Sequence, residues 1–287
     1  MPELPEVELY LHALEPRVVG RVIEGIRIRS PSLLKTYDPP ISAAAGRKVR
    51  GLRRVGKRVV FVLDDELFLV VHLMVAGRFQ WKDRGAAVPR KLGHAAFDFA
   101  DGTLLITEAG TKKRASLHLV RGEAVLAALD PGGVEPLTTD LPTFRDRLTR
   151  ENHTLKRALT DPHLFSGIGN AHSDEILWRA RRSPLQRTRN LDEEAIRALF
   201  NAVRDELGEW TARLRKEAGD AFPKKVTAFH PAMAVHGRFG EPCPRCGSAV
   251  QRIRYADHEI NYCATCQTEG RRLRDRGISR LLGEDWI

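Results

Sequence analysis

Long apolar runs are missing from this chain of 287 residues. A helix that crosses a membrane needs about 20 consecutive apolar residues, and no stretch of the sequence approaches that length. The amino terminus also has no apolar segment typical of a secretory signal. We therefore expect a soluble, cytoplasmic protein with no membrane partner.

Cysteine is scarce as well, and its position is informative. The chain has four cysteines, Cys243, Cys246, Cys263 and Cys266, all near the carboxyl end. This grouping argues against a disulfide framework and for a metal site in a reducing compartment. Two Cys-x2-Cys pairs separated by sixteen residues have the spacing of a tetrahedral four-thiolate zinc site. Because no ligand position is left open, we expect one structural Zn²⁺ that contributes to folding.

Acidic residues are in the minority, since 37 Asp and Glu face 47 Lys and Arg, for a net charge of +10. A balance this basic favours a polyanionic partner, most often nucleic acid. The spacer between the cysteine pairs contains Arg252, Arg254, Tyr255 and His258. It suits a hairpin that presents cations to phosphate, although many zinc ribbons are purely structural.

The first half of the chain has the pattern of an antiparallel β domain. Residues 7–14 have the pattern of an amphipathic helix that ends before Pro16. From residue 22 to residue 129 short β-type runs follow one another, and Asp101-Gly102 between two of them is a strong hairpin signal. The runs predict a sandwich or barrel with two hairpins, one from 57–63 and 67–74 and one from 95–100 and 103–107.

Helical periodicity takes over after a linker at residues 130–133 and Pro136. The longest periodic segment, residues 191–216, has one apolar stripe that predicts a core-facing helix. The stripe comprises Ile196, Leu199, Phe200, Val203, Leu207, Trp210 and Leu214, and the other expected helices are 143–150, 154–160 and 173–180.

The start of the chain, Met1-Pro2-Glu3, permits covalent chemistry. Removal of Met1, which a small second residue allows, leaves Pro2 with a secondary amine. Such an amine attacks an electrophilic sugar carbon without a cofactor, and the neighbouring Glu3 carboxylate suits proton transfer. On these residues alone the alternative is an ordinary helix start, where proline is common. If Met1 is retained, the Pro2 nitrogen is an amide and cannot act.

Two further segments suit contact with a nucleic acid. Gly167-Ile168-Gly169-Asn170 precedes an expected helix, where backbone N–H groups and the helix dipole favour phosphate. Lys156 and Asn170 would add a charge and an amide, and the alternative is a tight helix–helix turn. Met74 and Val75 are core residues by default, but at a loop tip they would wedge into a base stack.

Together these motifs resemble the formamidopyrimidine-DNA glycosylase and endonuclease VIII family of base-excision repair enzymes. The resemblance extends from Pro2 to about Gln267, in the family's order. Pro2-Glu3-Leu4-Pro5-Glu6-Val7 matches the family's amino terminus, and the segment 156–175 its helix-two-turns-helix element. Gly237-Arg238 and Gly240-Glu241-Pro242-Cys243 match the start of its zinc finger.

The resemblance implies an α+β, multidomain fold with DNA in the cleft between a β-sandwich and a helical domain. A leading helix and the β-sandwich would form the catalytic domain. The implied parts are the β-sandwich domain (1–130), a linker (131–142), the helix-two-turns-helix DNA-binding domain (143–236), the four-cysteine zinc finger (237–267) and a basic extension (268–287).

The resemblance also implies a bifunctional glycosylase and lyase that acts on oxidised bases. Pro2 would attack C1′ of the damaged nucleotide to form a Schiff base, Glu3 would assist ring opening, and β,δ-elimination would cut the strand. Lys57 matches the family's catalytic hairpin lysine. Lys156 and Asn170 match phosphate-binding positions, and Glu175 and Glu6 match supporting positions. The implied partner is damaged DNA, bound by a monomer at the nucleoid.

This sequence departs from the family at two DNA contacts. Residues 107–116 contain no phenylalanine for the void-filling loop, so Met74, Val75 and Ala76 would supply the wedge alone. His258 stands where the family has a phosphate-clamping arginine, and Arg252 or Arg254 would have to substitute. The extension 268–287 is either an added contact or a helix packed on the finger.

Two alternatives stay open from the sequence. One is a protein of the same fold that binds lesions or abasic sites without cutting them. The other is a zinc-ribbon transcription or RNA-binding protein, in which Pro2 and Glu3 have no special role.

Overall fold

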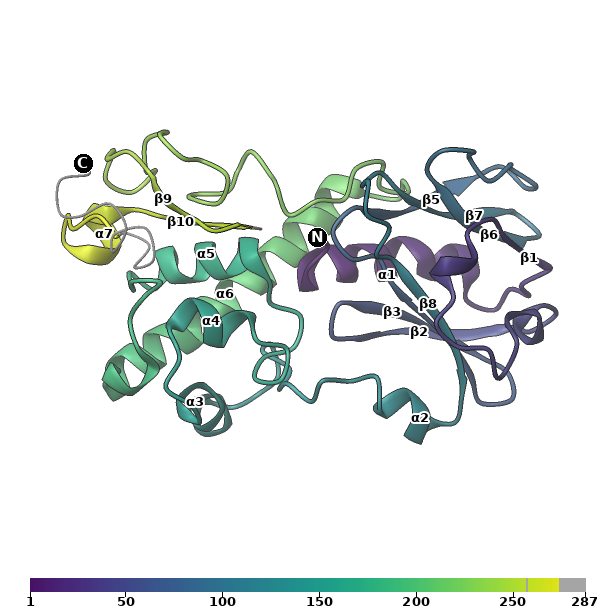
Figure 1. Ribbon diagram of the computed structural model, residues 1–287, viewed down its shortest axis with the longest axis horizontal. Helices are drawn as coiled ribbons and strands as arrows, with labels where there is room; N and C mark the ends of the chain where they lie inside the picture. Colours follow the sequence, from purple (N-terminus) through teal and green to yellow (C-terminus); the bar gives the residue numbers. More distant parts are fainter. Residues whose placement is uncertain (257, 274–287) are drawn as a thin grey trace. The chain divides into compact units, whose positions relative to one another are not determined.

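The chain forms two compact units in the computed structural model, which describes residues 1–256 and 258–273 (Figure 1). The first unit contains Met1–Gly132 and Glu209–Ala228, and the second contains Gly133–Gly208 and the described residues from Phe229 onward. Helix α6, Glu193–Ala218, begins in the second unit and ends in the first. Most of the expected basic extension, residues 274–287, lies outside the described residues.

Helix α1, Leu4–Val18, opens the first unit. Its first turn forms a capping box, in which the Glu3 carboxylate accepts from the backbone of Glu6 and the Glu6 carboxylate accepts from the backbone of Glu3. Pro5 fits there because the first turn needs no hydrogen bond from its nitrogen. The expected end before Pro16 is wrong, since the helix continues through this residue. The Arg17 guanidinium donates to the Ala13 carbonyl at 2.6 Å and ties down the last turn.

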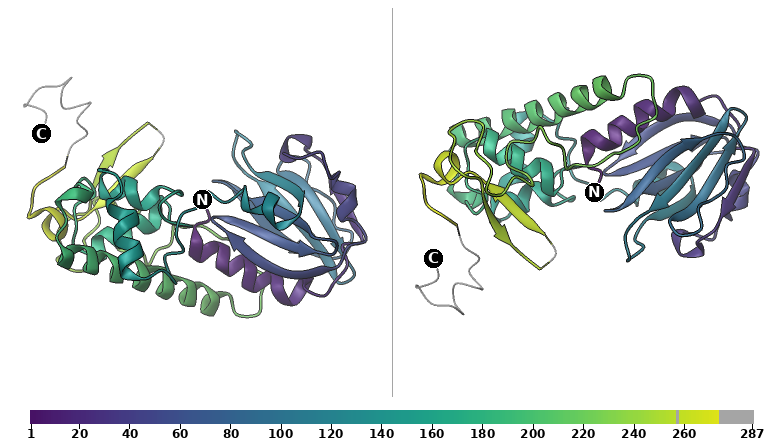
Figure 2. Two further views of the ribbon diagram at one scale, coloured as in Figure 1. Left: turned by 90° about the horizontal axis from the view of Figure 1, so that it is seen from below. Right: turned by 90° about the horizontal axis from the view of Figure 1, so that it is seen from above.

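Two four-stranded antiparallel sheets form the β-sandwich that the sequence predicts (Figure 2). Both expected hairpins are confirmed, one by the pairing of β3 with β4 and one by the pairing of β6 with β7. One sheet has the order β1 (Gly25–Ile28), β6 (Gly93–Phe99), β7 (Gly102–Glu108), β5 (Gly77–Lys82), and the other β2 (Val49–Val55), β3 (Arg58–Leu63), β4 (Leu67–His72), β8 (Ser116–Arg121).

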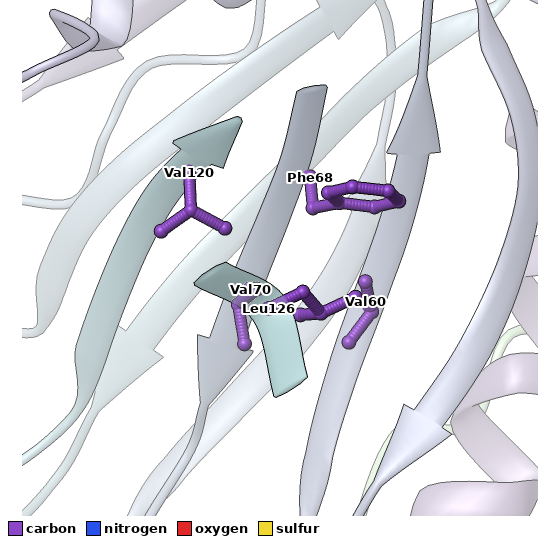
Figure 3. Close-up of a cluster of buried hydrophobic side chains, with 5 residues drawn as sticks. All are labelled: Val60, Phe68, Val70, Val120 and Leu126. Carbon is purple, nitrogen blue, oxygen red and sulfur yellow. The ribbon is translucent and has the colours of Figure 1, made fainter. Parts of the chain in front are cut away.

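Strands β3 and β4 are buried on both faces. On the inner face the rings of Phe61 and Phe79 meet edge to face, with centroids 6.4 Å apart. On the outer face the short helix α2, Glu123–Ala127, presses Leu126 onto the sheet (Figure 3). This outer cluster comprises Val60, Phe68, Val70, Val120 and Leu126. Burial of one such leucine contributes roughly 2 kcal/mol, so α2 covers an otherwise exposed apolar face.

The end of α6 packs with α1 in the first unit. Glu8 of α1 accepts from Arg215 of α6 at 3.0 Å and from Arg54 of β2 at 3.1 Å. Farther along α1, Arg17 donates to the Asp220 carbonyl at 2.7 Å. The Tyr10 ring lies 6.2 Å from that of Phe222. The first unit is therefore completed by residues that follow the second unit's helices in sequence.

The second unit begins with helices whose starts are fixed by side-chain caps. Asp140 accepts from the Thr143 N–H before α3, Leu141–Thr149, and Thr154 accepts from the Arg157 N–H before α4, Leu155–Thr160. Helix α5, Asn170–Arg179, follows the buried glycine turn at Gly167 and Gly169. The apolar stripe of α6 is buried as expected, with Phe200 partly exposed.

A small hairpin and a one-turn helix complete this unit. Strands β9, Gln251–Arg254, and β10, Glu259–Tyr262, pair antiparallel (Figure 2), and β10 is joined to α5 by hydrogen bonds. Helix α7, Ala264–Thr268, follows directly. Among the described residues, no helix is both long and apolar enough to cross a membrane.

Candidate functional site

The amino terminus lies in a buried, polar setting. Pro2 is buried, and Glu3 is 2% exposed. The Glu3 backbone donates to the Glu6 carboxylate at 2.8 Å, so the capping box fixes the position of the Glu3 carboxylate beside the terminus. Burial lowers the pKa of the terminal amine of Met1, and the Glu3 carboxylate opposes this lowering. An amine with a lowered pKa is unprotonated, and hence nucleophilic, in a larger fraction of molecules at neutral pH.

Cations from two other segments act on the same amine. Arg78 of β5 and Lys57 both lower its pKa through their positive charge. Lys57 lies in the tight turn that joins β2 to β3, next to Gly56, whose positive φ of 60° favours glycine. The structure thus brings the predicted catalytic residues Pro2, Glu3 and Lys57 into one neighbourhood of the first unit, together with Arg78, which no sequence motif indicated.

His72 is a second residue near Lys57 that no sequence motif indicated. Burial lowers its pKa to about 4, and the charges of Arg58 and Lys57 contribute to this lowering. Its Nε2 atom is buried and has no hydrogen-bond partner among the described residues. The only signal in the sequence is a histidine at the end of an apolar strand. The pairing register of β4, which cannot be read from the sequence, places His72 opposite Arg58 of β3 and Ser116 of β8.

The turn after β4 presents one of the two predicted wedge residues. Val75 is 56% exposed, whereas Met74 is partly buried and has a positive φ of 54°. The turn closes on Gly77, where a Cβ atom would lie 2.1 Å from the Leu73 carbonyl oxygen. Arg78 donates to the Val75 carbonyl at 3.2 Å and to that of Gly77 at 2.6 Å. The turn is therefore rigid, and Val75 is its outermost side chain.

In the second unit, Lys156 is buried and paired. Only 5% of the residue is exposed, and its ammonium group lies 2.5 Å from the Asp174 carboxylate and 2.6 Å from the Asn170 carbonyl. The Asn170 amide in turn donates to the Glu259 carbonyl of β10 at 2.9 Å. The two predicted phosphate-binding residues thus lie together, and they also connect α4 and α5 to the hairpin.

Two adjacent carboxylates in the first half of α5 organise the segment that enters the cysteine-rich region. Glu175 accepts from the backbone N–H groups of Ala234, Val235 and His236 at 2.7, 2.8 and 2.8 Å. Asp174 accepts from the ring of His236 at 2.8 Å. Burial raises the pKa of Glu175, and three N–H donors offset part of the cost of burying its charge. The predicted supporting role of Glu175 is consistent with this anchoring.

The four cysteines form one compact donor set. Their Sγ atoms lie within 4.8 Å of one another, as the ligands of a single tetrahedral Zn²⁺ do. Hydrogen bonds from Ser248 lower the pKa of Cys246 to about 6, which favours the thiolate that binds a metal. The Trp178 indole of α5 donates to Cys243 Sγ at 3.3 Å. The residues therefore fit the structural zinc expected from the spacing, and α5 is attached directly to it.

The hairpin β9–β10 carries the remaining predicted contacts. Arg254 and His258 are exposed, and the His258 ring stacks on Tyr255 at 4.7 Å with an interplanar angle of 10°. Arg252 lies 4.0 Å above the Phe239 ring and 3.6 Å from the Glu259 carboxylate. Arg254 and His258 are thus placed for external contact, whereas Arg252 is held within the unit.

Known proteins resemble this chain in both sequence and fold. Residues 1–112 match the formamidopyrimidine-DNA glycosylase N-terminal domain, residues 133–213 its H2TH domain, and residues 240–268 the zinc finger found in FPG and IleRS. The formamidopyrimidine-DNA glycosylase of Chloroflexus aurantiacus is 35% identical over 276 residues, which cover 93% of this chain and 98% of that protein. The chain belongs to the formamidopyrimidine-DNA glycosylase family.

Solved structures agree with this assignment. The complex of Lactococcus lactis Fpg with DNA containing an abasic site superposes with a TM-score of 0.81 at 28% identity, covering 93% of this chain and 99% of that one. A complex of the same enzyme with DNA containing N7-benzyl-Fapy-dG has a TM-score of 0.82 at 29% identity, covering 93% and 100%. The family resemblance, the β-sandwich with its helical and zinc-finger parts, and the zinc-binding set are confirmed.

Proposed function

We propose that this protein is a DNA glycosylase with AP-lyase activity, which excises oxidised bases from DNA in base excision repair. The observation that supports this most directly is the amino terminus. It is buried, its amine has a lowered pKa, and it lies beside the Glu3 carboxylate and within the electrostatic influence of Lys57 and Arg78. Removal of Met1 would transfer the amine to Pro2, one residue along and in the same surroundings.

The proposed reaction uses this amine as the nucleophile. The Pro2 nitrogen attacks C1′ of the damaged nucleotide, and the glycosidic bond breaks with its electron pair leaving on the base. Glu3 accepts the proton that the Pro2 nitrogen loses on bonding to C1′ and passes it to O4′ as the sugar ring opens, which leaves an iminium between Pro2 and C1′. Loss of a proton from C2′ then expels the 3′ phosphate, and a second elimination expels the 5′ phosphate. Water finally releases the sugar fragment from Pro2.

Cations of the first unit would bind the DNA backbone during these steps. Lys57 supplies a charge near the amine. In the tautomer of neutral His72 that carries its proton on Nε2, this atom would donate to a phosphate oxygen, since it has no hydrogen-bond partner among the described residues. Val75 would fill the gap left by the extruded nucleotide, because it is the exposed side chain of a rigid turn. Contacts of Lys156, Asn170, Arg254 and His258 with DNA are proposed from the family resemblance, and so is action as a monomer.

Reduction with borohydride tests the proposal, because it converts the iminium into a stable covalent link between protein and DNA. The processed protein, with Met1 removed, is incubated with a duplex that contains one abasic site. We expect a covalent adduct whose attachment maps to Pro2. A matched form with an extra residue before Pro2, which turns its nitrogen into an amide, should give none. Binding without an adduct from the processed protein would contradict the proposal and indicate a non-cleaving lesion binder.

A panel of duplexes, each with one oxidised base, then identifies the substrate. Excision is measured as strand cleavage at the lesion, and the undamaged duplex is the control. A protein that cleaves abasic DNA but none of the lesions would be a lyase without glycosylase activity.

A further inference from the structure

A buried carboxylate at the end of β7 shapes the loop that follows it. Glu108 is 1% exposed. Its carboxylate accepts from the Arg114 N–H at 2.9 and 3.1 Å and from the Ala115 N–H at 3.3 Å. The Lys113 ammonium donates to the Glu108 carbonyl. The loop therefore closes back onto the last residue of β7, and the Glu108 side chain fixes the backbone at Arg114 and Ala115.

His94 completes the partners of Glu108. Its Nε2 atom lies 3.0 Å from the Glu108 carboxylate, and the residue is 2% exposed. The β6–β7 ladder shifts register between Gly93 and Ala95, so His94 occupies a bulge. Bulges redirect a side chain out of the regular alternation of a strand. The bulge therefore directs the His94 imidazole toward the Glu108 carboxylate, which in turn binds the backbone of the loop.

The loop displays positive charge that nothing in the described residues balances. Thr111, Lys112, Lys113 and Arg114, called the basic loop below, are all exposed. Within residues 1–256 and 258–273 the side chains of Lys112 and Arg114 have no ion-pair partner. Other exposed arginines of the same unit are paired, for example Arg21 with Asp101 and Arg84 with Glu24.

The basic loop lies next to the turn that carries the proposed wedge. The Ala109 N–H donates to the Ala76 carbonyl at 3.4 Å, and a Cβ atom on Gly110 would lie 3.3 Å from that of Ala76. The sequence from Ala109 to Arg114 has no aromatic or large apolar side chain. The loop therefore has no ring or apolar wedge to insert between bases, whereas the two cations without an ion-pair partner are suited to phosphate.

We propose that the basic loop is a DNA phosphate-contact element, and that Glu108 and His94 are the residues that position it. The inference rests on the proposed action on DNA. Lys112 and Arg114 would bind backbone phosphates beside the turn at residues 74–76, and the loop would not insert a side chain into the duplex. The base opposite the lesion then has little influence on affinity, because Val75 alone enters the base stack.

The salt dependence of binding measures the loop's contribution. Each lost phosphate contact reduces the slope of log K against log salt by about 0.9. The variant Lys112→Ser/Arg114→Ser is compared with wild type on a duplex with one abasic site, in fluorescence anisotropy without borohydride. We expect the slope to fall by about 1 to 2 and the affinity to fall roughly tenfold near physiological salt. Changing the base opposite the abasic site should alter the wild-type affinity less than about threefold, well under the discrimination of a read base pair.

A matched control removes the same charge at the other end of the same sheet. The variant Arg21→Ser/Lys82→Ser suits this purpose. Lys82 lies opposite Thr103 in the β5–β7 ladder, and Arg21 forms an ion pair with Asp101, so both lie near the start of β7, whereas the basic loop follows its end. Its slope should stay within about 0.3 of wild type, a third of one phosphate contact. An equal slope for the loop variant and this control would overturn the proposal. Borohydride trapping of the wild type tests the proposed function separately, because adduct formation requires the reacting amine and does not depend on the loop.

The positioning role of Glu108 has its own readout. Trypsin cuts after lysine and arginine, so its rate of cleavage at Lys112, Lys113 and Arg114 reports the order of the loop. We expect Glu108→Gln to raise this rate severalfold, and abasic DNA to protect the loop in wild type. A circular dichroism melting curve checks that the variant is folded. Cleavage of the loop at the wild-type rate in a folded Glu108→Gln protein, or no protection by DNA, would contradict the proposal.

Discussion

The ammonium group of Lys156 lies 2.5 Å from the carboxylate of Asp174, and both side chains are almost completely buried. The same carboxylate also binds the ring of His236 and the backbone N–H of Asn261. One ion pair therefore connects α4, α5, the approach to the zinc finger and β10. A lysine that matches a phosphate-binding position thus has a structural task as well.

Substitution of Lys156 should reduce stability as well as DNA binding. Removal of one partner from a buried ion pair costs about 3–5 kcal/mol, because the other charge is left uncompensated. We expect Lys156→Ala to lower the free energy of unfolding by this amount in urea denaturation. The neighbouring Arg157→Ala, at an exposed site, should change it by less than about 0.5 kcal/mol. If both variants unfold alike, Lys156 has no such structural role.

Glu3→Gln should separate the capping of α1 from catalysis. An amide oxygen still accepts from the Glu6 N–H, so the unfolding free energy should change by less than about 1 kcal/mol. The amide cannot donate the proton that ring opening needs, and adduct formation should slow by about 10²- to 10⁴-fold. Glu8→Gln, farther along the same helix, serves as the control in single-turnover trapping. Unchanged trapping by Glu3→Gln would remove Glu3 from the mechanism.

His72 should make the protein sensitive to acid. Its pKa is about 4 when folded and 6.5 in a model peptide, so the unfolded chain binds more protons between these values. The full stability is present above about pH 6.5 and is lost progressively down to about pH 4, by up to roughly 3 kcal/mol. His72→Asn should flatten the difference in unfolding free energy between pH 7 and pH 5. His12→Asn, at an exposed site, should leave it unchanged.

Val75 should contribute more to lesion binding than Met74. Val75→Ser removes the exposed apolar tip of the turn, and we expect affinity for abasic DNA to fall at least about tenfold, in line with burial of one valine side chain. Met74→Asn keeps a residue that tolerates the positive φ of 54°. Its affinity should change less than about threefold, within the range of ordinary surface substitutions. A larger loss for Met74→Asn would identify Met74 as the wedge instead.

Zinc removal should be visible in tryptophan fluorescence. Trp178 donates to Cys243 Sγ, and the Arg245 guanidinium lies 4.1 Å above its ring. A chelator that strips the metal should separate the indole from the thiolate and unfold the finger. We expect one zinc ion per chain in elemental analysis and an emission change on chelation that Trp178→Phe largely abolishes. Retention of the full change in Trp178→Phe would show that another tryptophan reports metal loss.

Local patterns predicted much of this fold. The Asp101-Gly102 turn and the flanking strands defined a hairpin, and the cysteine spacing defined the metal site, because both signals lie within a short stretch of chain. The stripe of α6 likewise identified its buried face. The predicted helix end before Pro16 was wrong. A proline near a helix end does not always terminate the helix, and here the Arg17 side chain donates to the Ala13 carbonyl in the last turn.

Contacts between distant residues were beyond the sequence. Nothing local links Lys156 to Asp174, or His94 to Glu108, because each pair depends on how separate elements pack. The same holds for Arg78 and His72, whose significance lies in their proximity to the amino terminus or to Lys57. Family resemblance indicated Pro2, Glu3 and Lys57 through motifs, whereas the structure adds the electrostatic surroundings that suit their chemistry.

The contacts of Glu8 with Arg215 and of Arg17 with Asp220 bear on how the chain assembles during translation. Ribosomes extend a chain by about 5–20 residues per second, so α1 leaves the exit tunnel well before the segment that covers it. Until residue 228 has emerged, the first unit lacks residues 209–228, which belong to it. A fragment that stops at Gly132 would therefore be an incomplete folding unit, and grafting the first unit onto another DNA-binding protein requires the end of α6 to accompany it.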